Sequence, residues 1–109
     1  MAVAEAGGGT TAALTLNTPS TLSTQTSANI YVLVVDVSNM ANGDELIIRV
    51  TAKARSASSA KLAFERSYKN AQNEKLVYSF PITSPFSAAF SLEQVSGTGR
   101  TYEWSVYTL

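Results

Sequence analysis

Alternation of apolar and polar residues is the sequence feature that most constrains the fold of this chain. In residues 45–55, Leu46, Ile48 and Val50 fall on one side of an extended backbone, and the other side is polar or charged at every position except Ile47. A period of two places successive side chains on opposite faces of a β-strand, whereas an amphipathic helix needs a period near 3.6. Similar alternation occupies residues 61–68, 75–80, 101–109 and 86–95, where Phe90 and Leu92 share the inward face. Residues 29–37 are almost continuously apolar and β-branched, which predicts a strand covered on both faces.

These strands are separated by residues that favour turns. Asn42-Gly43 supplies left-handed backbone geometry, Pro81 and Pro85 bracket a non-helical link, and residues 96–99 form a Gly-rich turn. Evenly spaced short strands with turns between them are typical of two-sheet folds. We therefore predict an all-β chain, a single β-sandwich or jelly roll of seven to eight mostly antiparallel strands.

The first 27 residues differ from the rest in composition. They are poor in large apolar side chains and rich in Ala, Gly, Ser and Thr, and Gly7-Gly8-Gly9 is a flexible break. We predict an extended N-terminal arm over residues 1–27 and a β-sandwich domain over residues 28–109. An arm of this composition would be ordered by a neighbouring molecule. Its candidate contacts are Leu14, Leu16 and Leu22.

The chain has no histidine and no cysteine. Imidazole relays, thiolate nucleophiles and structural zinc sites need these side chains. The only carboxylate pair that a hairpin could bring together, Glu93 and Glu103, is explained more simply by solvent-facing strand positions. The loop that best resembles a calcium site, Asn39 to Glu45, is explained by turn formation. We predict no enzymatic activity, no cofactor and no metal.

Charge is balanced overall but unevenly placed. Net charge is zero with a pI near 6.2, which disfavours nucleic acid as a partner, and no apolar run approaches the length of a membrane span. Residues 49–75 carry seven basic and two acidic residues, a net charge of +5, and the rest of the chain carries −5. This bias predicts a basic face that meets an acidic partner or another copy, although such charges also protect exposed strands from pairing. The candidate residues are Arg49, Lys53, Arg55, Lys61 and Lys69.

Tyr102, Trp104 and Tyr107 form the densest aromatic group in the sequence. Tyr102, Trp104 and Val106 alternate as a core face should, which would leave Tyr107 facing outward. We therefore take Tyr107 as a candidate interface residue. An exposed Trp/Tyr platform that stacks on sugars is the alternative.

The runs NGDELIIRVTAKARS, AFERSYKNAQ and SGTGRTYEWSV, within residues 38–109, resemble small virion proteins encoded among the head genes of tailed bacteriophages. This resemblance implies a head decoration, or cement, protein. Such a protein would bind the major capsid protein and copies of itself, as a dimer or trimer. It would be made in the host cytoplasm and located in the virion, with no nucleic-acid or membrane partner. Alternatives are a carbohydrate-binding or adhesive β-sandwich module, or a jelly-roll coat protein that forms the shell itself.

Overall fold

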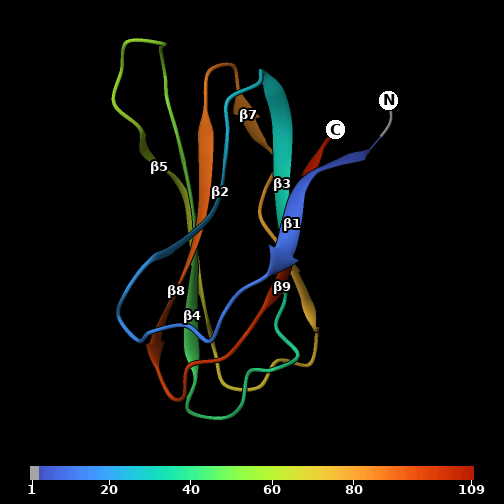
Figure 1. The fold of residues 1–109 in the computed structure, drawn as a ribbon, viewed down its shortest axis with the longest axis vertical. Helices are drawn as coiled ribbons and strands as arrows, with labels where there is room; N and C mark the ends of the chain where they lie inside the picture. The colour runs from blue at the N-terminus through green and yellow to red at the C-terminus, as the bar shows by residue number, and fades with distance from the viewer. Residues whose placement is uncertain (1–2) are drawn as a thin grey trace.

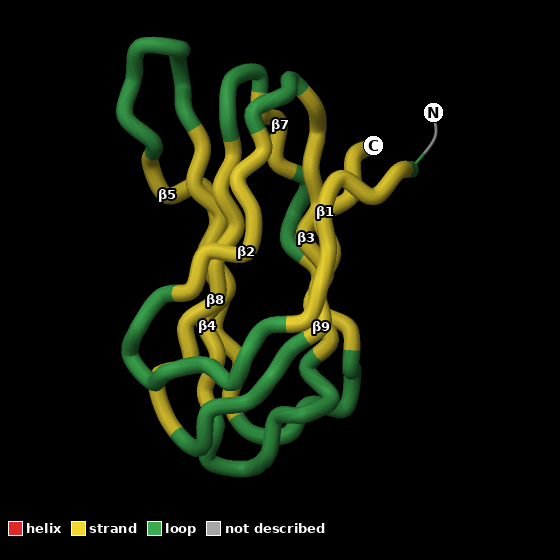
Figure 2. Tube along the Cα trace, in the orientation of Figure 1, coloured by secondary structure: helices red, strands yellow, loops and turns green. Residues whose placement is uncertain are grey.

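The computed structural model describes residues 3–109 and contains nine β-strands in that range (Figures 1 and 2). The strands are β1 (Ala4–Thr10), β2 (Ser20–Gln25), β3 (Asn29–Asp36), β4 (Glu45–Ala52), β5 (Lys61–Lys69), β6 (Leu76–Tyr78), β7 (Ile82–Ser84), β8 (Ala88–Ser96) and β9 (Glu103–Thr108). No helix in the described residues is long and apolar enough to cross a membrane.

The strands form two antiparallel sheets. Sheet A has the order β1-β9-β3-β6, with the short strand β7 also pairing with β3, and sheet B has the order β2-β8-β4-β5. Buried residues from both sheets form one hydrophobic core, in which the rings of Tyr31 and Phe90 meet edge to face at 5.9 Å. The expected all-β class is therefore confirmed. The described residues form nine strands instead of seven to eight, and β1, β2 and β7 lie outside the strand ranges expected above.

The segment that we expected to extend as an arm contributes one strand to each sheet. Strand β1 pairs with β9 and strand β2 pairs with β8 (Figure 1). Leu14 is buried, Leu22 packs against the core, and Leu16 is half-buried. Backbone pairing along a sheet edge needs no large side chains, so a segment rich in Gly, Ser and Thr can form it without an apolar pattern.

Alternation predicts the inward faces of the long strands well. Leu46, Ile48 and Val50 in β4 are at most 1% exposed, and Phe90 and Leu92 in β8 are fully buried. Prolines and bulges disturb the pattern elsewhere. A register shift between β4 and β5 places Phe64 opposite Val50 but Leu62 opposite Thr51, which leaves Leu62 exposed.

Candidate binding groove

The outer face of sheet A, which faces away from sheet B, carries two rows of residues across four strands. Tyr31, Leu33 and Val35 point inward and are fully buried, so the alternate residues of β3 point outward. The strand register then defines both rows. The first row is Leu76, Asp36, Glu103 and Thr10, and the second is Tyr78, Val34, Ser105 and Gly8.

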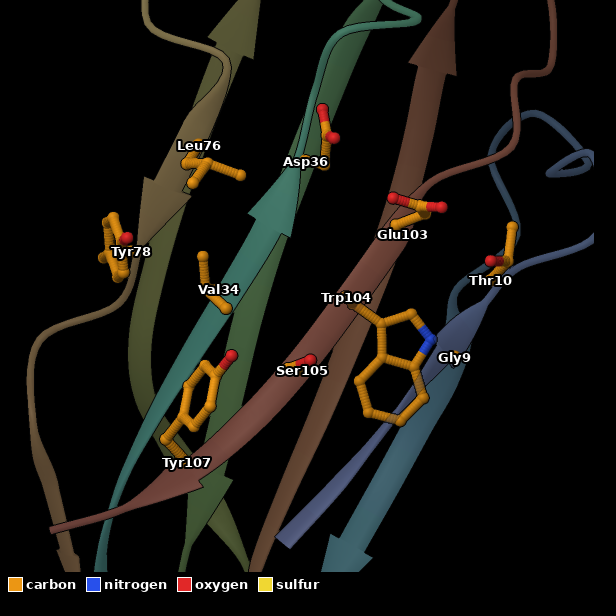
Figure 3. Close-up of a pocket in the computed structure, with 10 residues that line it drawn as sticks. All are labelled: Gly9, Thr10, Val34, Asp36, Leu76, Tyr78, Glu103, Trp104, Ser105 and Tyr107. Carbon is orange, nitrogen blue, oxygen red and sulfur yellow. The ribbon is translucent and has the colours of Figure 1, made fainter. Parts of the chain in front are cut away.

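A groove of about 390 Å³ lies over these rows (Figure 3). Val34 forms its floor and is 8% exposed, whereas Tyr78 is 57% exposed. Tyr107 lies at the end of the groove away from Asp36 and Glu103. An aromatic and apolar floor with carboxylates at one end suits a ligand that has both an apolar surface and polar or positively charged groups.

The carboxylates of Asp36 and Glu103 belong to residues that lie directly opposite each other on neighbouring strands. The side-chain and backbone hydrogen bonds from Ser38 hold the pKa of Asp36 below its usual range, and nearby Lys75 lowers this pKa further. Like charges in directly opposite positions destabilise a sheet. This pair would therefore gain from a bound cation or hydrogen-bond donor.

Charge differs between the two sheets. The strands of sheet A contain three carboxylates, Glu5, Asp36 and Glu103, and no lysine or arginine. All the basic residues that lie in strands belong to β4 and β5 of sheet B. The imbalance along the sequence thus becomes an imbalance between the two layers of the fold.

The predicted basic face does not form one surface. Arg49 is engaged in ion pairs with Glu65 and Glu93. Lys69 lies at the end of β5 that pairs with Glu45. The remaining predicted residues, Lys53, Arg55 and Lys61, stand around the turn between β4 and β5.

Tyr107 lines the groove, as its expected outward position suggested. Tyr102 is fully buried and cannot stack on a ligand, and Trp104 is half-buried against the core. Sequence reasoning missed Asp36 and Val34, because the run in residues 29–37 is so apolar that it was interpreted as covered on both faces. Asp36 is the one charged residue of that run and was the available signal.

Glu93 and Glu103 do not converge. Glu93 is on β8 in sheet B and binds Arg49, whereas Glu103 is on β9 in sheet A. The suggested calcium loop is also used internally, because Asp44 is buried and accepts hydrogen bonds from the backbone N–H groups of Ala41 and Thr98. The carboxylates of Glu93 and Asp44 are therefore bound by groups of the chain itself.

A second polar cluster lies buried beneath the turn at residues 96–100. Gln94 donates to the carbonyls of Ser96 and Thr98, and its Oε1 accepts from the Arg100 N–H and the Tyr102 hydroxyl. Both ends of this buried amide are satisfied, so the cluster holds the turn in place instead of forming an open site.

The titration of Tyr102 should report the burial of this cluster. Burial raises its pKa to about 12, with a further contribution from Asp44. The folded-state pKa of Tyr102 lies above the unfolded value of 10. The contribution of Tyr102 to the free energy of unfolding should therefore be fully present below pH 10 and decrease as pH rises toward 12. We expect Tyr102→Phe to remove part of the alkaline loss of stability, measured by urea unfolding from pH 8 to 11. An identical pH dependence in both proteins would contradict this assignment.

Comparison of the chain with protein-family models, with curated proteins and with solved structures found no match. Arguments about function must therefore start from the surfaces of this molecule. Two surfaces stand out, the acidic aromatic groove on sheet A and the exposed apolar side chains near β5 and β6, and they share Leu76 and Tyr78.

Proposed function

We propose that this chain is a structural virion protein, a decoration or cement component of a tailed-phage head. Its β-sandwich body would bind the major capsid protein and copies of itself, without catalysis. The resemblance of residues 38–109 to small virion proteins supports the proposal. The chain would be made in the host cytoplasm and reside in the virion.

One surface observation carries the proposal. Leu62, Leu76, Tyr78 and Phe80, which we call the apolar edge, are each at least 50% exposed. Leu62 lies in β5 and Leu76 and Tyr78 lie in β6, and these strands are at the edges of the two sheets. Phe80 follows two positions after the end of β6. Large apolar and aromatic groups that are exposed along sheet edges are typical of protein-binding surfaces.

Local contacts hold Phe80, at this edge, in a fixed position. The ring of Phe80 meets that of Phe64 edge to face at 5.5 Å, and the Arg66 guanidinium lies 5.2 Å from the Phe80 ring centre. An ordered aromatic group loses little conformational entropy when a partner covers it. The edge is therefore suited to act as an anchor.

The N-terminal segment supports the same role in a different way from that expected. Strand β1 pairs only with β9, so its other side presents backbone groups that a strand of a neighbouring molecule can bind. Binding through a sheet edge would replace the binding that we expected from a free arm.

The test is co-sedimentation of the protein with phage heads that lack it, together with light scattering of the protein alone. We expect the double variant Leu62→Ser/Phe80→Ser to bind heads at least tenfold more weakly than the wild type, because two apolar anchors are lost. The matched control is Val3→Ser, which removes an exposed apolar side chain away from the apolar edge. Wild-type protein that never sediments with heads, or a double variant that binds as the wild type does, would overturn the proposal.

A further inference from the structure

We propose that the groove on sheet A receives the turn between β4 and β5 of a second copy of this chain. The inference rests on the proposed role in assembly and names one partner for it. The turn comprises residues 53–60, and we call Lys53, Arg55 and the adjoining Lys61 the basic turn. Two charged surfaces would then join copies head to tail.

The shape of the turn suits insertion. In Figures 1 and 2 it projects beyond the rest of the molecule. Between its basic residues the sequence consists only of alanine and serine, so the tip is slim. A single backbone hydrogen bond, from the Ser58 N–H to the Arg55 carbonyl, spans the tip.

The charge of the turn is free to act on another molecule. The described residues contain three ion pairs. Their cations are Arg49 and Arg100, and no residue of the basic turn takes part in them. Arg55 and Lys61 are exposed and Lys53 is half-buried. Three cations on a projecting loop would be steered toward a surface of opposite charge.

The groove provides such a surface. Asp36 and Glu103 lie side by side at one end of the groove, and Lys75 is close enough to Asp36 to lower its pKa. Tyr78 and Tyr107 supply aromatic rings on which a guanidinium or ammonium group can pack. A cation bound between the two carboxylates would also relieve their mutual repulsion.

The two surfaces cannot meet within one chain. Strand β3 ends at Asp36, the chain turns back through residues 37–44, and β4 then runs in the opposite direction toward the basic turn. The turn therefore lies at the far end of the molecule from Asp36, on the other sheet (Figure 1). Contact between them must join two copies, and a head-to-tail contact generates rings or open chains instead of a closed two-fold dimer.

The test uses a groove variant, Glu103→Lys, and a turn variant, Lys53→Ser/Arg55→Ser. Sedimentation velocity at about 50 mM salt should show concentration-dependent association of the wild type, weakened several-fold at about 500 mM salt because charge attraction is screened. Each variant alone should associate at least tenfold more weakly. An equimolar mixture should form a 1:1 dimer that does not grow, because the groove variant has an intact turn and the turn variant has an intact groove.

The matched control is Lys69→Ser, which removes an exposed cation at the other end of β5 and should leave association unchanged. A monomeric wild type, unaffected association in either variant, or a mixture that fails to pair would overturn the inference. Binding of a neutral oligosaccharide such as cellohexaose at Tyr78 and Tyr107, with a monomeric wild type, would also overturn it.

The two proposals fail separately. If Leu62→Ser/Phe80→Ser loses head binding while Glu103→Lys has no effect on self-association, the proposed function stands and the head-to-tail contact fails. If the two charge variants complement each other but no protein binds heads, the head-to-tail contact stands and the proposed function fails.

Discussion

Phe90→Ala should lower the free energy of unfolding by about 4 kcal/mol. Phe90 is fully buried in β8, and its ring contacts that of Tyr31 across the core. The substitution removes most of the side chain and leaves a cavity between the two sheets. Both the lost burial and the lost aromatic contact act in the same direction. Urea unfolding monitored by circular dichroism measures the change.

Phe80→Ala is the matched control, because Phe80 is 60% exposed. The same truncation at that position should cost less than about 1 kcal/mol. Similar losses at the two positions would mean that Phe90 does not join the sheets as described.

The buried core was predictable because apolar residues alternate with polar ones along the long strands. In β4 the alternation of Leu46, Ile48 and Val50 specifies which face is buried, since a shift of one residue would expose all three side chains. The same reasoning identified the buried residues of β8 and the outward side chain of Tyr107. Long strands carry enough alternating positions to determine their own orientation.

Strands β1 and β2 could not be predicted in this way. Their residues are mostly half-buried or exposed, and their order comes from backbone pairing with β9 and β8. That pairing depends on which strand edges are free, which is a property of the complete fold. Gly8 adds a local reason, because a Cβ there would lie only 3.1 Å from the Trp104 carbonyl oxygen, so the bare backbone fits closely against β9.

The groove was predictable only in part. Tyr107 could be assigned to a surface from β9 alone, but its neighbours Tyr78 and Asp36 come from β6 and β3. Which strands lie side by side is set by the sheet order and not by any one segment. In the same way, the sequence showed that basic and acidic residues were segregated, whereas only the fold shows that the segregation separates sheet A from the basic turn.

Asp44→Ala should lower the free energy of unfolding by about 3 kcal/mol. The Asp44 carboxylate is nearly inaccessible and lies 2.9 Å from Arg100 Nε. It also accepts hydrogen bonds from the backbone N–H groups of Ala41 and Thr98. Gly97 is fitted closely around it, since a Cβ at Gly97 would lie only 1.9 Å from Asp44 Oδ1. Alanine would leave these donors without their acceptor.

The same carboxylate gives this prediction a pH signature. Burial raises the pKa of Asp44, but the hydrogen bonds from Ala41, Arg100 and Thr98 outweigh burial, so the pKa lies below its ordinary value of 3.8. The stabilisation is therefore fully present above about pH 4 and is lost as pH falls through the folded-state pKa. The stability gap between wild type and Asp44→Ala should narrow under acid, while Glu74→Ala, an exposed control, should match the wild type throughout. A gap that stays constant down to pH 2 would show that the loss comes from packing and not from the charged carboxylate.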